Sequence, residues 1–518
     1  MINIVGSGLA GLSAAITLAE RNIKCNLVSV QESYRAQSVM AEGGINAALN
    51  TMNEDDDVSL HYEDTLKGGA YLGEETAIKG LTENAVDIVY WLKTIGVPFE
   101  SKDGKIVLRN FGGQKKKRTA YVKSSTGKML MTAMIDEARK YEVKGLIRRF
   151  DHHEVYDLLI DNNNCNGLKM YDIYTGKAYE VKGPVILATG GLTGMFPGLT
   201  TGSRDNTGML VSKLFLKGLK LGNLEMIQYH PTTINITGKR LLVSEAARGE
   251  GGRFMTYKNN EPYYFMEDMY PEFKNLVTRD VASRTIYKVL NDETCNGVYL
   301  DMTGIDSSVW DSKLSDMRNE LMDYIHVDIA SKPFAIEPGI HYFMGGVYVD
   351  NNHSTSINNL YAAGECACKY HGANRLGGNS LLGAIYGGRV AGNSISEDSN
   401  DAIQEIDNDY IRLDEAYSEN IKNILVSGLG IIRNHESINN AIKQIDLLLE
   451  KDLNAVQYEK AMLAKAMLLS ALNRKESRGA HYRDDYPESD DSFKKTGIVS
   501  YKDGIVIEYV DINGGKAI

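Results

Sequence analysis

The chain has 518 residues, of which 43% are hydrophobic and 24% charged, so it can bury a large core and is long enough for two to four domains. Its formal net charge of -11 gives no general attraction to nucleic acid or to an acidic membrane surface, so an anion site has to be made locally positive by individual Arg and His side chains. The five cysteines form no C-x-x-C pair, and this leaves no zinc or iron–sulfur ligand set within the chain. The start of the sequence has no basic and apolar leader, and no apolar run approaches the roughly 18 residues that span a bilayer. We therefore expect a cytoplasmic protein without direct membrane insertion.

The first predicted elements are a strand, Ile2–Val5, a glycine-rich turn, and an Ala-rich helix that continues to Glu20. The turn matches the G-x-G-x-x-G pattern, in which glycines let the backbone approach a pyrophosphate at a helix N-terminus. A cofactor of the dinucleotide type is therefore predicted to contact Gly6, Ser7, Gly8, Ala10 and Gly11. The second strand, Cys25–Val30, carries Ser29 where an acidic ribose partner is usual. Its hydroxyl could accept the same hydrogen bond, or the strand end is only structural.

Three later segments favour FAD over NAD as the cofactor. Each is a glycine turn or the glycine-containing end of a buried strand, and the three occupy residues 41–46, 185–191 and 360–365. Strand ends that expose backbone at such wide intervals suit a long cofactor lying across a sheet. The candidate cofactor contacts are Ala41, Gly43, Gly44, Gly190 and Glu365. The alternative is that these glycines only mark the places where strands end and loops begin.

Four basic residues are candidates for a clamp on a dianion. They are His230, Arg279, His341 and Arg375, and each lies in a short stretch that contains Gly or Pro or in a Thr-Arg-Asp triplet. A guanidinium binds a carboxylate through two parallel hydrogen bonds, which an ammonium cannot do. Taken singly, each of these residues could instead belong to a turn or to a local ion pair.

Two charge runs and several histidines have simpler interpretations. Lys115–Arg118 is basic and Glu54–Asp57 is acidic, and we interpret both as solvated surface. His152, His153 and His371 are not spaced as metal ligands, so no metal site is predicted.

Eight motifs in a fixed order carry a family resemblance that extends over almost the whole chain. The chain resembles the flavoproteins of the succinate dehydrogenase, fumarate reductase and L-aspartate oxidase superfamily. The motifs are Ala41-Glu42-Gly43-Gly44, His61-Tyr62-Glu63-Asp64-Thr65, His230-Pro231-Thr232, the segment from Ser244 to Gly252, Arg279-Asp280, His341 to Gly346, His371 to Leu382, and Ser477-Arg478-Gly479-Ala480-His481.

The resemblance implies an α/β protein with a Rossmann-like FAD-binding domain in two segments, 1–229 and 341–398. An α+β capping domain, 230–340, would be inserted between them, followed by a helical domain, 399–476, and a tail, 477–518. The residues independently favour helices from about Asp401 to Arg474, where Ile442, Ile445, Leu448 and Leu449 recur at helical spacing. A hairpin is predicted around Asp503-Gly504.

By the same resemblance, residues take roles in hydride transfer between flavin and a C4 dicarboxylate. His230, Ser244, His341 and Arg375 would hold the two carboxylates. Arg279 would be the general acid in fumarate reduction and the base in succinate oxidation, and Glu245 and Arg248 would relay protons to it. Ser380 and Leu381 would join the cofactor contacts.

Four departures from the family pattern are specific to this chain. Gln37 occupies the position at which respiratory members carry the His that bonds covalently to flavin, so we expect noncovalent FAD. Ser244 replaces the more common Thr, and Met209 in Thr207-Gly208-Met209-Leu210 stands where the family tends to have Asp. Phe111 precedes a Gly pair where L-aspartate oxidases typically have a Glu that meets the substrate ammonium.

The favoured function is therefore interconversion of fumarate and succinate by an enzyme of the fumarate reductase or succinate dehydrogenase flavoprotein type. One alternative is an L-aspartate oxidase, which makes iminoaspartate for NAD biosynthesis. Another is a catalytically silent FAD-binding subunit that relays electrons. The expected partners are the dicarboxylate and an iron–sulfur or other electron-transfer subunit, and no nucleic acid.

Overall fold

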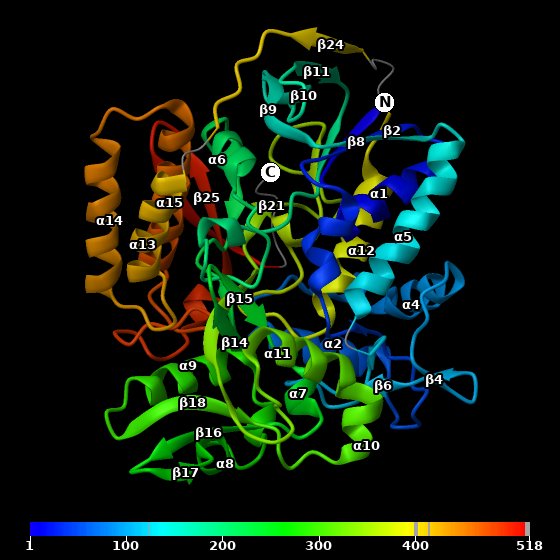
Figure 1. Ribbon diagram of the computed structural model, residues 1–518. Helices are drawn as coiled ribbons and strands as arrows, with labels where there is room; N and C mark the ends of the chain where they lie inside the picture. Colours follow the sequence, from blue (N-terminus) through cyan, green and yellow to red (C-terminus); the bar gives the residue numbers. More distant parts are fainter. Residues whose placement is uncertain (124, 398–401, 413–414, 513–518) are drawn as a thin grey trace.

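A parallel five-stranded sheet forms the centre of the computed structural model, which describes residues 1–123, 125–397, 402–412 and 415–512 (Figure 1). The strand order is β22-β12-β1-β2-β8. The bounds are β1 (Ile2–Val5), β2 (Cys25–Ser29), β8 (Ile147–Asp151), β12 (Val185–Leu187) and β22 (Leu360–Ala362). β1, β12 and β22 are almost wholly apolar, as expected for strands buried on both faces.

Helices cover this sheet and bring the two halves of the sequence together. α1 (Leu9–Glu20) packs against α12 (Asn379–Ser394) and α5 (Thr126–Val143). Small residues make the close approach possible, since a Cβ on Gly388 of α12 would lie 2.4 Å from the backbone oxygen of Ala10. The predicted α/β fold with a Rossmann-like core is thus confirmed.

The antiparallel sheet β24-β11-β10-β9 lies beside the central sheet. Its strands are β9 (His153–Asp161), β10 (Asn164–Asp172), β11 (Ala178–Lys182) and β24 (Ile403–Ile406). β24 falls in the range predicted to be helical, so that prediction is wrong for these four residues. They pair with the free edge of β11, and a hydrogen-bonded partner there outweighs a weak helical preference in so short a segment.

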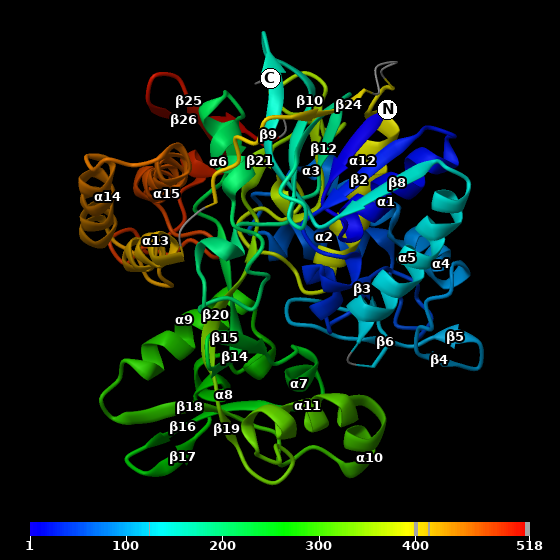
Figure 2. The same ribbon diagram turned by 45° about the horizontal axis from the view of Figure 1, so that its top comes forward.

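Residues 230–340, which we call the cap, form a separate lobe below the central sheet (Figure 2). Its sheet has the order β17-β16-β18-β19, with β16 (Arg253–Lys258), β17 (Glu261–Tyr263), β18 (Cys295–Asp301) and β19 (Phe334–Ala335). α7 (Ala246–Gly249), α8 (Phe265–Met269), α9 (Arg279–Leu290), α10 (Ser307–Val309) and α11 (Ser315–Ile325) complete it around its own apolar core. The chain enters through β14 (Ile227–Ile236) and leaves through β20 (Glu337–Phe343), which pair with each other, while β15 (Lys239–Leu242) pairs with β14.

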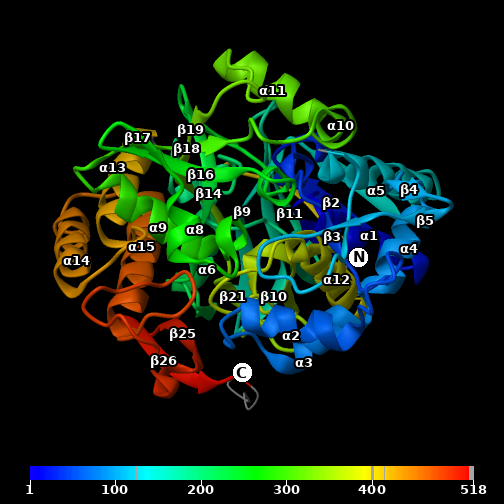
Figure 3. The same ribbon diagram turned by 90° about the horizontal axis from the view of Figure 1, so that it is seen from below.

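Three helices and a hairpin follow the central domain and lie on the side of the molecule opposite α4 and α5 (Figure 3). The helices are α13 (Glu415–Gly428), α14 (His435–Leu449) and α15 (Ala455–Asn473), and Asn434 and Asn454 close capping boxes at the starts of the last two. The hairpin predicted at Asp503-Gly504 is confirmed as β25 (Lys495–Tyr501) and β26 (Ile505–Asp511). It joins the sheet β23-β21-β13-β25-β26 through β13 (Leu221–Gly222), with β21 (Gly346–Tyr348) and β23 (Ala367–Cys368). The expected domain limit at residues 398 and 399 lies outside the described residues.

The remaining elements that matter for the site lie between β2 and α5, and after β12. They are β3 (Ile45–Asn46), α2 (Val58–Gly68), α3 (Glu75–Glu83), α4 (Ala85–Thr94), β4 (Ser101–Lys102), β5 (Lys105–Ile106), β6 (Leu108–Arg109), β7 (Thr119–Ala120) and α6 (Met209–Leu216). Over the described residues, none of the helices is both long enough and apolar enough to cross a membrane.

Candidate active site

A cavity of about 670 Å³ lies where the carboxyl ends of β1, β2 and β12 face the cap. Its wall combines segments that are far apart in the sequence, from the Gly6 turn to the start of α12. Every site residue predicted from the sequence lines it except two, Gly11 and Arg248. The tertiary structure therefore brings both predicted sets, cofactor and substrate residues, into one space.

The glycine-rich turn after β1 has the close packing that its pattern predicts. Gly6 has φ +109°, and a Cβ there would lie 2.2 Å from the backbone oxygen of Ala188. Gly11 does not face the cavity, but a Cβ on it would lie 1.9 Å from the oxygen of Gly6. The hydroxyl of Ser7 donates to that of Ser29 over 2.9 Å, and Ser29 in turn donates to the backbone oxygen of Gln31. Ser29 is thus tied to the phosphate-binding turn of the predicted cofactor site.

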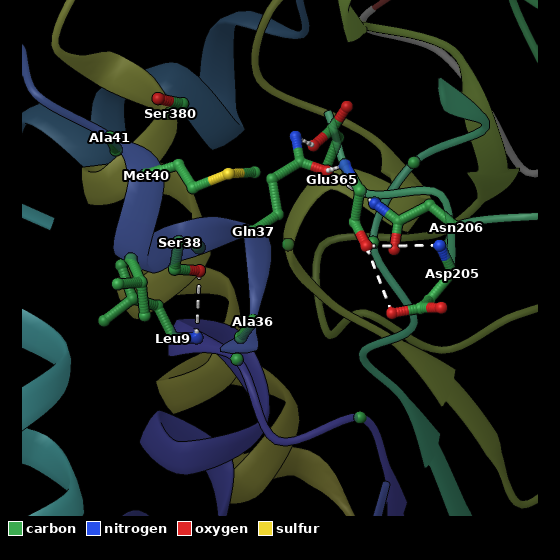
Figure 4. Close-up of a pocket in the computed structure, with 18 of the residues that line it drawn as sticks. Leu9, Ala36, Gln37, Ser38, Met40, Ala41, Asp205, Asn206, Glu365 and Ser380 are labelled. Carbon is green, nitrogen blue, oxygen red and sulfur yellow. Dashed lines mark hydrogen bonds between the residues drawn. The ribbon is translucent and has the colours of Figure 1, made fainter. Parts of the chain in front are cut away.

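At the other side of the cavity, the Gln37 side chain links its own segment to residues 203–206 and to Glu365 (Figure 4). Its Oε1 accepts hydrogen bonds from Asn206 Nδ2 at 2.6 Å and from the Ser203 backbone at 3.2 Å. Its Nε2 donates to Oε2 of Glu365 over 3.3 Å, and the Phe343 backbone donates to Oε1 of the same carboxyl. Burial raises the pKa of Glu365 to about 7. The sequence did not identify Asn206 as a site residue. It directly precedes Thr207–Leu210, the segment in which Met209 replaces the Asp that is usual in the family.

The four clamp residues converge on the cavity from the cap and from the central domain. The rings of His230 and His341 lie 5.0 Å apart, and Thr201 Oγ1 lies 2.7 Å from Nδ1 of His341. Burial, reinforced by neighbouring positive charges, holds the pKa of both imidazoles well below the usual range, so both are neutral at pH 7. The clamp therefore combines neutral imidazole with charged guanidinium.

Arg375 is one of the two buried cations of this clamp. Its guanidinium lies over the Tyr342 ring, 4.4 Å from the centroid. Burial, with the charge of Arg279 nearby, lowers the pKa of Arg375 to about 9, which leaves it protonated at pH 7. Its Nε is buried without a hydrogen-bond partner among the described residues. A buried charged donor of this kind requires an acceptor, and a bound carboxylate would supply one.

Arg279, Glu245 and Arg248 form a continuous buried chain of ion pairs. Arg279 donates to Oε2 of Glu245 through Nε at 3.0 Å and Nη2 at 2.8 Å. Arg248 Nη2 lies 3.0 Å from Oε1 of the same carboxylate, and the Gly112 backbone also donates to Oε1 at 3.0 Å. Burial alone would raise the pKa of Glu245, but the two guanidinium groups outweigh it and hold the pKa below the ordinary value. Arg248 itself does not line the cavity.

Two residues missed by sequence reasoning organise the clamp. Gln228 Oε1 accepts from Arg279 at 3.2 Å, while its Nε2 donates to the backbone oxygen of Arg375 at 2.9 Å. Tyr342 packs under Arg375. Gln228 lies two residues before His230 in β14, and alternation along a strand was the signal that could have identified it.

Phe111 is 1% exposed and forms an apolar part of the cavity wall. Its ring fits against two glycines, because a Cβ on Gly43 or Gly377 would lie 3.1 or 3.0 Å from ring atoms. The Arg109 guanidinium lies 5.7 Å from the ring centroid.

The interpretation of the two charge runs as solvated surface is wrong for their buried members. Arg118 is fully buried and lies 2.9 Å from carboxylate oxygens of both Asp56 and Asp64. Lys117 pairs with Glu54 at 2.9 Å. Ion pairs between the acidic and the basic run neutralise part of their charge. This pairing could not be predicted from either run by itself.

The residues present fit FAD. The cavity extends from the glycine turn, suited to a pyrophosphate, to the polar group around Gln37 and the clamp. The Thr189 hydroxyl in this wall is buried without a partner among the described residues, as expected of a group that bonds a ligand. No three His, Cys, Asp or Glu side chains gather as a metal site would require in the part of the chain that the structure describes.

The chain is similar to known flavoproteins in sequence and in structure. The family model described as an FAD binding domain matches residues 2–381, and the model of the fumarate reductase flavoprotein C-terminal region matches residues 458–516. The chain is 36% identical to the succinate dehydrogenase flavoprotein subunit of Bacillus subtilis, over 99% of this chain and 96% of the relative. It is 31% identical to L-aspartate oxidase 2 of Ralstonia nicotianae, over 94% and 91%.

A solved structure of an E. coli quinol fumarate reductase variant superposes with a TM-score of 0.87 and 27% identity, covering 100% of this chain and 97% of that chain. The sequence matches and the superposition each extend over nearly the full length, and so include the central sheet, the cap and the C-terminal elements. The chain therefore belongs to the FAD-dependent oxidoreductase family of succinate dehydrogenase and fumarate reductase flavoproteins.

Proposed function

We propose that this protein interconverts fumarate and succinate, with FAD bound noncovalently. The observation that carries the proposal is the meeting of a dianion clamp and a buried proton relay at one cavity, beside the FAD-binding turn. Either feature alone has structural explanations. A scaffold that only bound flavin would have no use for both.

The clamp suits a dicarboxylate of four carbons. Arg375 provides the charge for one carboxylate, and the neutral His230 and His341 with the Ser244 hydroxyl provide directed donors for the other. Neutral imidazoles keep the site from accumulating positive charge when no substrate is bound, so substrate affinity does not depend on their titration near pH 7. Fixed donors also polarise the double bond without reorganisation.

Proton transfer is assigned to Arg279, which lines the cavity and contacts Glu245 behind it. A guanidinium is a weak acid, so the role of Arg279 depends on rapid return of the proton. Glu245 accepts hydrogen bonds from Arg279 and forms an ion pair with Arg248, and this arrangement supports a relay from Arg248 through Glu245 to Arg279. When bound, FAD accepts or supplies the hydride.

The noncovalent state of the flavin follows from Gln37. An amide cannot form the bond that histidine forms at this position in respiratory relatives. Here the amide is also occupied, since it bonds Ser203, Asn206 and Glu365. Acid precipitation should therefore release FAD into the supernatant.

Phe111 favours an unsubstituted dicarboxylate over aspartate. An ammonium placed against this apolar wall would find no carboxylate on Phe111 itself, and an ammonium buried without a partner costs several kcal/mol, or more than a hundredfold in affinity. The second candidate, L-aspartate oxidase, is kept because of the similarity to such an enzyme over most of the chain. A cytoplasmic location and an iron–sulfur or other electron-transfer partner are also part of the proposal.

The test compares two reactions of the purified, FAD-loaded protein. One is anaerobic oxidation of a reduced viologen by fumarate, and the other is formation of peroxide from L-aspartate in air. Fumarate turnover without aspartate turnover supports the proposal. Rapid peroxide formation with aspartate, and none with fumarate, would replace it by the oxidase; no turnover of either would favour the silent subunit.

A further inference from the structure

We propose that Gly112 and Gly377 form a slot in the central domain that receives the Glu245 carboxylate of the cap. Docking of the cap then completes the proton relay and sets its geometry. The proposal rests on the function proposed above, in which Glu245 relays protons, and it assigns a positioning role to two glycines outside that relay.

The slot is defined by close contacts on both oxygens of the carboxylate. A Cβ on Gly112 would lie 2.8 Å from Oε1, and a Cβ on Gly377 would lie 2.9 Å from Oε2. Both distances are shorter than carbon and oxygen can approach without displacement. Neither glycine has a positive φ, so alanine could adopt the backbone conformation at both positions, and only the missing space requires glycine.

Gly112 also contributes a hydrogen bond. Its backbone N–H donates to Oε1 over 3.0 Å, in addition to the contacts from the two arginines. This bond helps to hold the pKa of Glu245 below the ordinary value. A buried carboxylate needs such bonds to remain ionised, and an ionised Glu245 is the state that can take a proton from Arg248.

The cap completes the other side of the contact. A Cβ on Gly112 would also lie 3.0 Å from the Val277 backbone oxygen, and Arg248 Nη1 lies 3.3 Å from that same oxygen. One residue later, a Cβ on Gly113 would meet the Thr278 methyl at 3.2 Å. The dipeptide Gly112-Gly113 therefore packs against Val277 and Thr278, the two cap residues that directly precede Arg279.

The slot is held rigidly from behind. Asp64 Oδ2 accepts from the Lys115 backbone at 3.0 Å and pairs with Arg118, which fixes the end of the Gly112 loop to α2. Gln114 Nε2 donates to the backbone oxygen of Gly377 at 3.2 Å and to Asn46 Oδ1 at 3.0 Å, which fixes the two walls to each other. A supported glycine pair can position a carboxylate more sharply than a free loop could.

Gly112→Ala tests the slot, Gly377→Ala tests its opposite wall, and Gly304→Ala is the matched control. Gly304 is exposed in the cap, has no positive φ and has open space where its Cβ would be. For Gly112→Ala we expect kcat for fumarate reduction to fall at least thirtyfold. The KM for fumarate and the dissociation constant of FAD should stay within threefold. The new Cβ should displace the Glu245 carboxylate from the backbone N–H of residue 112. Loss of that hydrogen bond raises the pKa of Glu245, so the acid limb of the pH profile of kcat should move to higher pH.

A double-mutant cycle with Glu245→Gln separates positioning from general damage. Gly112→Ala should cost little further activity once Glu245 is Gln, whereas independent losses would multiply. If the wild-type protein reduces fumarate, and both Gly112→Ala and Gly377→Ala are as active as Gly304→Ala, the slot is overturned but the proposed function is not. A wild-type protein that does not reduce fumarate would instead overturn the proposed function. If Gly112→Ala does not fold, Gly377→Ala and the same cycle decide the question from the other wall.

Discussion

Arg279 donates two hydrogen bonds to a single oxygen of Glu245, from Nε at 3.0 Å and from Nη2 at 2.8 Å. Its third nitrogen, Nη1, donates to Gln228 Oε1, so the guanidinium is held in one orientation beside the cavity. The other oxygen of Glu245 meets Arg248 and Gly112. The proposed proton donor and the carboxylate proposed to recharge it are thus in direct contact.

Replacing Arg279 with Gln should remove the proton donor while keeping a polar side chain of similar reach. We expect kcat for fumarate reduction to fall by about 10²–10⁴, the usual contribution of a positioned acid. FAD content and fumarate affinity should change little, as measured by flavin absorbance on titration with fumarate. Lys288→Gln, an exposed change on the same helix, is the control, and equal activities of the two variants would remove Arg279 from this role.

Phe111→Glu should reverse the preference between fumarate and aspartate. A carboxylate in this wall opposes the fumarate dianion and offers an ammonium its partner, so the ratio of kcat/KM values should shift by at least about 100-fold toward aspartate. Phe111→Leu, which keeps an apolar wall, should retain most of the fumarate activity. An unchanged ratio in Phe111→Glu would show that this position does not determine the substrate.

Arg118→Met should destabilise the protein by about 3–5 kcal/mol, because it leaves two buried carboxylates without their shared cation. The neighbouring Lys117→Met breaks an exposed pair with Glu54 and should cost less than about 1 kcal/mol. Urea unfolding followed by circular dichroism compares the two. Similar midpoints would mean that the buried group contributes no more than a surface ion pair.

Lys460 predicts a pH-dependent stability. Its ammonium is 1% exposed in α15 and has no hydrogen-bond partner among the described residues, and burial lowers its pKa from 10.5 to about 8. Below about pH 8 both folded and unfolded states are protonated, and burial of the charge reduces the free energy of unfolding by about 1–3 kcal/mol. Between about pH 8 and 10.5 the unfolded state binds the additional proton, so stability rises with pH.

Lys460→Met should therefore increase the free energy of unfolding at pH 7 and remove that rise. Denaturant unfolding at pH 7 and pH 9.5 measures both effects. Lys465→Met, on the same helix but paired with Asp446, is the control and should change stability little. A destabilised Lys460→Met at pH 7 would contradict the assignment of an unpaired buried charge.

Much of the fold was predictable because its signals are local. The apolar strand before Gly6, the helix after it and the turn at Asp503-Gly504 each depend on neighbouring residues, and each is present in the structure. The strand Ile403–Ile406 could not be predicted in this way, because it forms only by pairing with the edge of β11. The roles of the site residues stay predictions, although nearly all of these residues line one cavity.

The sequence by itself determined the properties that follow from the chemistry of single side chains. Gln37 has no imidazole to form a covalent bond to flavin, Phe111 has no carboxylate to pair with an ammonium, and Gly6 permits a backbone conformation that other residues resist. Those properties are the same in any fold. Only the tertiary structure decided the charge states and the partners, such as the neutral His230 and the burial of Arg118 between two carboxylates. Burial and Coulomb interactions depend on distances in space, and residues that are far apart in the sequence acquire those distances only when the chain is folded.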